Sequence, residues 1–280
     1  MQLRQQLIST NGIQLNVASA GDGPPVLLLH GFPDTHTVWR KQFGPLTAAG
    51  YRVIAPDLRG YGASAAPSGV QAYGIATLRD DILGLMDAMQ IGQVRLIGHD
   101  WGSVLGWYLC MHAPERIERF AALSVGHPAA YANAGLAQLC KAWYAALFQL
   151  PGIAESLVSF GNLLALEAQA ADATQLADWR ANFARPGRLT AALNYYRANR
   201  TLAIDPSYDK IQVPVLGIWS AHDPALTETQ MRDSARYMAA PFRYHRIDGS
   251  VGHWLQLKEE MQVNNLLVDF CAETLSPSVK

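Results

Sequence analysis

The sequence has few charged residues, few cysteines and a net charge close to zero. Only 16% of its 280 residues are charged, and the formal net charge is −1. A chain this close to neutral has no general electrostatic attraction to nucleic acid or to an anionic membrane surface. Its three cysteines, Cys110, Cys140 and Cys271, are widely spaced. They predict neither a disulfide framework nor a cysteine metal site.

Long apolar runs are also missing. No stretch approaches the roughly 18 uninterrupted apolar residues that a membrane-spanning helix needs. The first ten residues, MQLRQQLIST, contain no apolar core of a secretory signal. Hydrophobic residues nevertheless make up 50% of the chain, which is enough for a large core. We therefore expect a cytoplasmic globular protein with no membrane or nucleic-acid partner; the oligomeric state stays open, and a homo-oligomer is allowed.

Short apolar runs alternate with helical patterns along both ends of the chain. Two alternating segments flank Asn11-Gly12, which is typical of a β-hairpin. Further strands are expected at 26–30, 51–55, 94–97, 120–125, 213–219 and 242–247. Helices are expected at 38–49, 78–89, 104–111, 229–238 and 254–270. This alternation with short links predicts an α/β protein with a doubly wound, mostly parallel sheet.

The alternation stops in the middle of the chain. Residues 129–206 are rich in alanine, carry several tyrosines and tryptophans, and contain no convincing strand. We interpret them as a helical cap inserted into the sheet domain. The predicted division is a core domain of residues 1–128 and 207–280 and a cap domain of residues 129–206.

The most informative segment is Leu96-Ile-Gly-His-Asp-Trp-Gly-Ser103. It predicts a strand, a tight turn centred on Asp100, and a helix, which is the pattern of a nucleophile elbow. Small residues at Gly98 and Gly102 let the backbone turn closely. Two other interpretations stay open: Asp100 could only cap the helix that follows it, or Ser124 in Ala122-Leu-Ser-Val-Gly126 could be the nucleophile.

An elbow nucleophile needs an acid and a base. Asp223 follows the expected strand at 213–219, and His253 follows the strand at 242–247. The chain order of nucleophile, acid and histidine is that of α/β-hydrolases. Both residues come just after the carboxyl ends of strands, where open α/β sheets bind ligands. His222 and His245 are the competing histidines, and His99 is expected to point away from Asp100.

The segment His30-Gly-Phe-Pro33 ends the first parallel strand. In this fold, such a loop provides one backbone N–H of an oxyanion hole, and the residue after the nucleophile provides the other. Phe32 and Trp101 are therefore the expected donors. The bond before Pro33 is a candidate for a cis peptide.

Together these motifs resemble the epoxide hydrolases of the α/β-hydrolase superfamily. His-Gly-Phe-Pro, Gly-His-Asp-Trp-Gly and Leu-Asn-Tyr-Tyr-Arg (193–197) occur in the family order, and the resemblance covers nearly the whole chain. It implies that Asp100 is the nucleophile, His253 the base and Asp223 its acid. It also implies that two cap tyrosines, Tyr196 and Tyr144, act as acids, with Tyr195 as a rival.

That family implies a small apolar epoxide as substrate and neither a metal nor an organic cofactor. Haloalkane dehalogenases are the alternative, because they share the fold, the aspartate and the histidine. They also need side-chain N–H donors for the halide. Phe32 has none, which leaves Trp101, Trp143 and Trp179 as candidate donors. A non-catalytic binding protein on the same scaffold is a third hypothesis.

Overall fold

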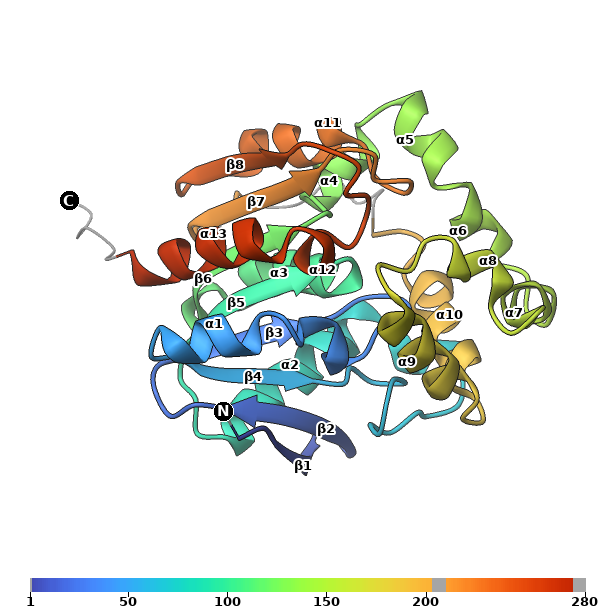
Figure 1. The fold of residues 1–280 in the computed structure, drawn as a ribbon, viewed down its shortest axis with the longest axis horizontal. Helices are drawn as coiled ribbons and strands as arrows, with labels where there is room; N and C mark the ends of the chain where they lie inside the picture. The colour runs from blue at the N-terminus through green and yellow to red at the C-terminus, as the bar shows by residue number, and fades with distance from the viewer. Residues whose placement is uncertain (1, 203–209, 274–280) are drawn as a thin grey trace.

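The computed structural model describes residues 2–202 and 210–273. Within these residues the strands form one eight-stranded sheet in the order β1-β2-β4-β3-β5-β6-β7-β8 (Figure 1). β1 and β2 form the predicted hairpin and run antiparallel, and the pairs from β4 to β8 are parallel. The strand bounds are Arg4–Thr10, Ile13–Ala20, Pro25–Leu29, Arg52–Pro56, Val94–His99, Ile117–Leu123, Val215–Ser220 and Phe242–Ile247.

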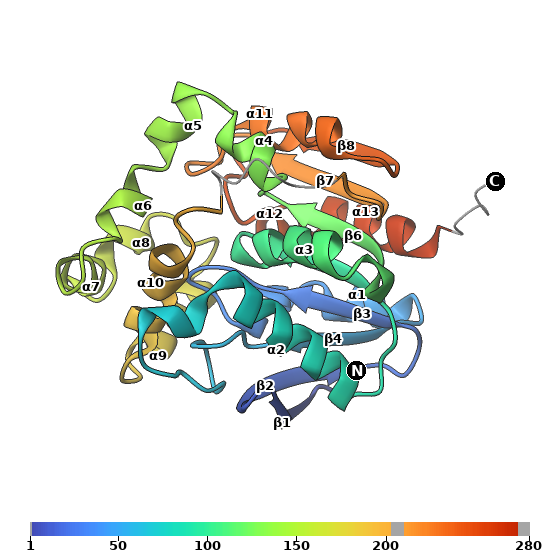
Figure 2. The same ribbon diagram turned by 180° about the vertical axis from the view of Figure 1, so that it is seen from behind.

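Helices cover both faces of the sheet, which confirms the doubly wound α/β prediction. α1 (Phe43–Ala48), α12 (Leu255–Lys258) and α13 (Glu260–Ala272) lie on the face turned toward the viewer in Figure 1. α2 (Ile75–Ala88), α3 (Trp101–His112) and α11 (Glu228–Arg232) cover the opposite face (Figure 2). No helix among the described residues is long and apolar enough to cross a membrane.

Three predicted helices are interrupted in the structure. Residues 38–49 form a short 3-10 helix, His36–Trp39, and then α1, while residues 229–238 form α11 and a 3-10 turn. Residues 254–270 form α12 and α13, which are separated at Glu259. The buried side-chain amide of Gln42 donates hydrogen bonds to the carbonyl of Gln256 (2.8 Å) and to Oδ1 of Asn264 (3.0 Å). Gln42 thus provides a hydrogen-bond partner for a carbonyl of the short helix α12. The spacing of apolar residues in the sequence gives no sign of this contact.

Seven helices connect β6 to β7 and lie beyond the carboxyl ends of the strands (Figure 1). They are α4 (Pro128–Ala132), α5 (Leu136–Lys141), α6 (Trp143–Leu147), α7 (Ile153–Ser159), α8 (Leu164–Glu167), α9 (Ala173–Phe183) and α10 (Arg188–Ala198). The structure describes this segment over residues 128–202, and the seven helices are counted there. We call them the cap. The division into two domains stays a prediction, because its second boundary, 206/207, lies outside the described residues.

The turn from β5 to α3 depends on two close backbone approaches. A Cβ atom on Gly98 would lie 2.4 Å from the carbonyl oxygen of Gly102, and one on Gly102 would lie 1.9 Å from that of Leu29. Backbone atoms cannot move aside as flexible side chains do. Both positions therefore require glycine, and the two glycines let α3 start directly against the central strands.

This close approach predicts a specific loss of stability. Gly102→Ala should lower the free energy of unfolding by about 2 kcal/mol or more, because the methyl group overpacks the backbone. Gly44 is a matched control: it is also the second residue of a helix, and a Cβ there meets nothing within 4 Å. Gly44→Ala should leave stability unchanged or raise it slightly. Urea unfolding measures both, and equal stabilities of the two variants would contradict the packing argument.

Candidate active site at the carboxyl ends of the strands

Asp100 lies at the turn between β5 and α3, in a strained backbone conformation. Its φ is 53° and its ψ is −121°, which a residue with a Cβ adopts only when its surroundings impose it. The backbone N–H of Phe32 donates a hydrogen bond to Oδ1 of Asp100 at 2.7 Å. Burial raises the pKa of Asp100. His253 and the hydrogen bond from the backbone of Trp101 lower it by more, so the pKa lies below its ordinary value. The carboxylate is therefore ionised at neutral pH.

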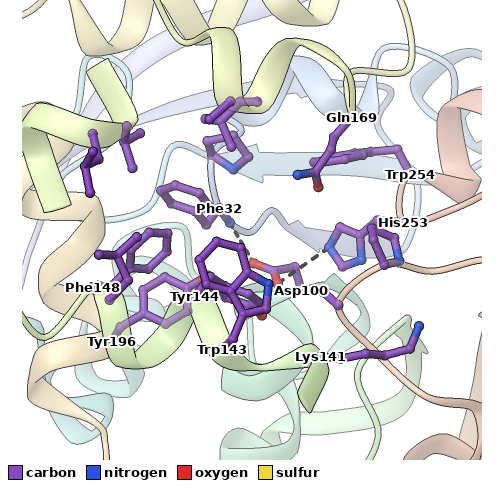
Figure 3. A pocket seen from close by; sticks show the side chains of 18 residues that line it. Phe32, Asp100, Lys141, Trp143, Tyr144, Phe148, Gln169, Tyr196, His253 and Trp254 are labelled. Atoms are coloured by element: carbon purple, nitrogen blue, oxygen red, sulfur yellow. Dashed lines mark hydrogen bonds and ion pairs between the residues drawn. The ribbon is translucent and has the colours of Figure 1, made fainter. Parts of the chain in front are cut away.

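His253 lies between two carboxylates. Its Nδ1 is 2.8 Å from Oδ2 of Asp223. Its Nε2 is 3.6 Å from Oδ2 of Asp100, a contact drawn as a dashed line in Figure 3. Burial lowers the pKa of His253, but the charges and hydrogen bonds of the two carboxylates outweigh it and raise this pKa to about 10. The ring is thus an imidazolium at neutral pH while both carboxylates are charged.

Asp223 is held by the turn that follows β7. Its Oδ1 accepts hydrogen bonds from the backbone N–H groups of Ala225 (2.9 Å) and Leu226 (3.0 Å), which leaves Oδ2 for His253. The carboxylate is completely buried. One side chain therefore both holds the turn and pairs with the histidine.

The competing residues lie elsewhere or have other partners. The hydroxyl of Ser124 donates to the backbone carbonyl of His253 at 3.2 Å and has no contact with the imidazole nitrogens. His222 is exposed, and Nε2 of His245 lies 3.0 Å from the side-chain amide of Gln262. The geometry therefore favours Asp100 over Ser124, and His253 over the other two histidines.

His99 lies beside the site, although the sequence suggests no role for it. Its ring centroid is 4.6 Å from that of His253, and its Nε2 is 3.0 Å from the His253 carbonyl oxygen. Burial and the neighbouring His253 lower the pKa of His99 to about 3. The ring is therefore neutral, and it supports the loop that carries His253 without adding a charge.

Phe32 and Trp101, the predicted donors of an oxyanion hole, lie on either side of Asp100 in the loop after β3 and at the start of α3. Phe32 follows β3, and the bond between Phe32 and Pro33 is cis. Gly31 makes this approach possible, since a Cβ there would lie 2.3 Å from Oδ1 of Asp100. Trp101 is the first residue of α3, so its backbone N–H has no partner within that helix.

Tyr144 from α6 and Tyr196 from α10 both line the cavity that contains Asp100 (Figure 3). Their ring centroids are 6.0 Å apart. Burial, together with nearby groups that include Asp100, raises the pKa of each phenol well above its ordinary value, so both hydroxyls are protonated. The rival Tyr195 points away from this cavity, and its hydroxyl donates to the carbonyl of Arg59 at 2.7 Å.

The cavity above Asp100, called the first cavity below, has a volume of about 260 Å³ and mostly apolar walls. Residues of the cap and residues of the loops that follow the strands line it together. Its lining includes Phe32, Trp143, Leu147, Phe148, Leu157, Val158, Leu166 and Trp254. Among the described residues, no group of histidine, cysteine, aspartate and glutamate side chains could hold a metal ion.

Asp34 is a buried carboxylate that the sequence interpretation missed. Its Oδ1 accepts hydrogen bonds from Gln175 (2.8 Å) and from the indole of Trp179 (2.7 Å), both on cap helix α9. Its Oδ2 accepts from the indole of Trp254 at 2.7 Å, next to His253. Burial raises the pKa of Asp34 to about 6 against these hydrogen bonds. The only signal in the sequence is a carboxylate one residue after the His-Gly-Phe-Pro motif.

Comparisons with known proteins agree with this geometry. A family model described as the alpha/beta hydrolase fold matches residues 24–260. The AB hydrolase superfamily protein YfhM of Bacillus subtilis is 37% identical over 95% of this chain and 96% of its own length. Epoxide hydrolase A of Mycobacterium tuberculosis is 33% identical over 95% of this chain and 96% of its own length. The chain belongs to the epoxide hydrolases of the α/β-hydrolase superfamily.

A solved epoxide hydrolase structure leads to the same family. The crystal structure of the epoxide hydrolase VrEH1 from Vigna radiata aligns with a TM-score of 0.85 at 31% identity. The alignment covers 96% of this chain and 97% of that one. Both the fold class and the family that the sequence motifs predict are thus confirmed.

Asp34 generates a prediction about how the cap is attached. Asp34→Ala would leave three buried N–H donors without an acceptor and should lower the free energy of unfolding by about 3 kcal/mol or more. Asp34→Asn should cost less, because its carbonyl oxygen can still accept from Gln175 and Trp179. Urea unfolding of both variants measures the difference. An alanine variant as stable as the asparagine variant would rule out this role.

Proposed function

We propose that this protein hydrolyses an apolar epoxide to a vicinal diol through an ester formed on Asp100. The observation that carries the proposal is an ionised carboxylate at the elbow, with the His253–Asp223 pair on one side and two protonated phenols lining the same cavity. A carboxylate that opens an epoxide leaves an alkyl ester, which water can hydrolyse at the carbonyl carbon. A serine would leave an ether, which the same groups could not cleave.

Ring opening needs an acid as well as a nucleophile. As the carboxylate of Asp100 bonds to one ring carbon, the C–O bond breaks and the oxygen gains negative charge. Tyr144 and Tyr196 donate hydrogen bonds to this oxygen, and one of them transfers its proton. The raised pKa of both phenols keeps them protonated in the free enzyme, ready to act as donors.

The imidazolium state of His253 completes the proton balance. Once Asp100 is esterified, His253 faces one carboxylate instead of two and its pKa falls. The imidazolium then gives its own proton to the tyrosinate, which restores the phenol and leaves a neutral imidazole. In the second step this imidazole takes a proton from water, and the resulting hydroxide attacks the ester carbonyl. Release of the diol restores ionised Asp100 and protonated His253, so the cycle neither gains nor loses a proton.

Backbone N–H groups stabilise the second step. The tetrahedral intermediate places a negative charge on an oxygen of Asp100, within reach of the backbone N–H groups of Phe32 and Trp101. Phe32 already donates to Oδ1 at 2.7 Å before any substrate binds. One such donor typically lowers the barrier by about 3 kcal/mol.

The hydrogen-bond donors at the site suit haloalkane dehalogenation less well than epoxide hydrolysis. Displacement of a halide needs N–H side chains directed at the leaving group. The indole of Trp179 is completely buried and donates to Asp34 at 2.7 Å, so it is not available. Trp143 lines the first cavity but is 68% exposed, and Phe32 has no side-chain donor. Trp101 is left as a single candidate among the three tryptophans. The phenols therefore favour an epoxide oxygen as the leaving group.

A side-by-side assay tests the proposed function. The protein is incubated with styrene oxide and with n-bromobutane, and diol and bromide are measured separately. We expect diol from the epoxide and no release of bromide. Bromide release without diol would identify a dehalogenase, and neither product would point to a non-catalytic binding protein.

The same assay tests the two phenols. Tyr196→Phe and Tyr144→Phe should each lower kcat/KM for the epoxide at least tenfold, because each removes one acid. Tyr195→Phe is the matched control on the same helix, since its hydroxyl bonds to the carbonyl of Arg59. It should retain turnover. Full activity in Tyr196→Phe would show that its hydroxyl is not the acid.

The pKa values predict that the two steps respond differently to a fall in pH. Alkylation needs ionised Asp100, whose pKa is lowered, so this step should persist as the pH falls. Hydrolysis of the ester needs neutral His253, so this step should slow as the pH falls. The ester should therefore accumulate between about pH 7 and pH 5, within the range in which histidines titrate. Rapid quenching followed by intact-protein mass spectrometry measures the ester; less ester at lower pH would contradict this assignment.

A further inference from the structure

A second cavity is also lined by the two phenols and by Asp100. It has a volume of about 310 Å³ and shares Asp100, Tyr144 and Tyr196 with the first cavity. The remaining lining residues that the structure describes differ completely between the two cavities. The described lining of the second cavity is completed by Trp101, Val104, Val125, Gly126, Pro128, Tyr131, Ala145, Gln149, Asn199, Arg200, Leu202 and Leu226. The carboxylate and both phenols thus lie where the two cavities meet.

The walls of the second cavity present mainly apolar surface. Two of its amide side chains already have partners within the protein. Asn199 accepts a hydrogen bond from the backbone N–H of Ile75 (2.7 Å) and donates to the carbonyls of Tyr73 and Tyr195 (both 2.8 Å). The amide of Gln149 donates to the backbone carbonyl of Tyr196 at 3.2 Å. Arg200 is exposed and contributes its charge at the edge.

This arrangement constrains the substrate. The reacting ring must lie at Asp100 and the phenols, where the two cavities meet. A substituent on one ring carbon can then extend into the first cavity, and a substituent on the other carbon can extend into the second. An epoxide with a single substituent would leave one apolar cavity without apolar contacts.

We propose that the preferred substrates are internal epoxides with an apolar substituent on each ring carbon. This inference rests on the proposed function, because it assigns both cavities to the reaction at Asp100. Each methylene group transferred from water to an apolar wall strengthens binding by about fourfold. Ordering the flexible chain offsets part of that gain. A second butyl substituent should therefore raise kcat/KM at least tenfold.

The test compares two substrates of the wild-type protein, trans-dibutyl oxirane and butyl oxirane. Diol formation gives kcat/KM for each, and their ratio is called the dibutyl preference below. Steric hindrance at both carbons slows attack on the dibutyl compound in the absence of a binding site. A dibutyl preference of at least ten therefore reports contacts with the second substituent.

Three alanine-to-phenylalanine variants test whether each cavity holds one of the two butyl groups. Ala145→Phe fills part of the second cavity, and Ala165→Phe fills part of the first. Each should lower the dibutyl preference at least fivefold, because one butyl group loses its space. Ala168→Phe is the matched control: Ala168 is an exposed cap residue that lines neither cavity, so the preference should not change. Thermal unfolding verifies that each variant is folded.

The outcomes separate this inference from the proposed function. Turnover of butyl oxirane without a dibutyl preference would overturn the two-cavity inference and leave the proposed function intact. A folded Ala145→Phe variant with an unchanged preference would also overturn it. If neither epoxide is converted, both the proposed function and the inference fail.

Discussion

Everything at this site depends on one carboxylate held in a strained turn. Asp100 has a positive φ between a central strand and a buried helix, and Gly98 and Gly102 provide the space for that turn. Strain of this kind persists only when the surroundings outweigh it. Here the packing of α3 against the sheet holds the turn, and the hydrogen bond from Phe32 fixes the carboxylate. The proposed nucleophile is therefore oriented before any substrate arrives.

The charges around Asp100 are arranged for a reaction in two steps. An imidazolium between two carboxylates is stable, and a neutral imidazole beside one carboxylate and an ester is a base. In the proposed reaction, loss of the Asp100 charge in the first step thus prepares His253 for the second. The same proposal assigns the proton on the substrate oxygen to the two phenols of raised pKa. The cap is necessary for this scheme, because both phenols belong to it, and Asp34 connects cap helix α9 to the loops of Phe32 and His253.

Much of the fold and part of the site could be predicted from the sequence. Parallel strands end at one edge of a sheet, so residues that follow them, such as Asp100, Asp223 and His253, are brought together by topology. The cap is different. Tyr195 and Tyr196 are adjacent on one helix, and only the packing of that helix decides which of them faces the cavity. Asp34 could not be interpreted for the same reason, since its partners lie in distant segments. The second cavity likewise depends on how the cap helices pack.

Trapping of the ester on Asp100 tests the central claim most directly. His253→Gln removes the base but leaves Asp100 and the phenols, so incubation with an epoxide should raise the protein mass by the mass of that epoxide. Fragmentation should locate the addition on Asp100, and His245→Gln, a change outside the site, should show no lasting adduct. A His253→Gln protein that stays unmodified, or that carries the adduct on another residue, would contradict the account.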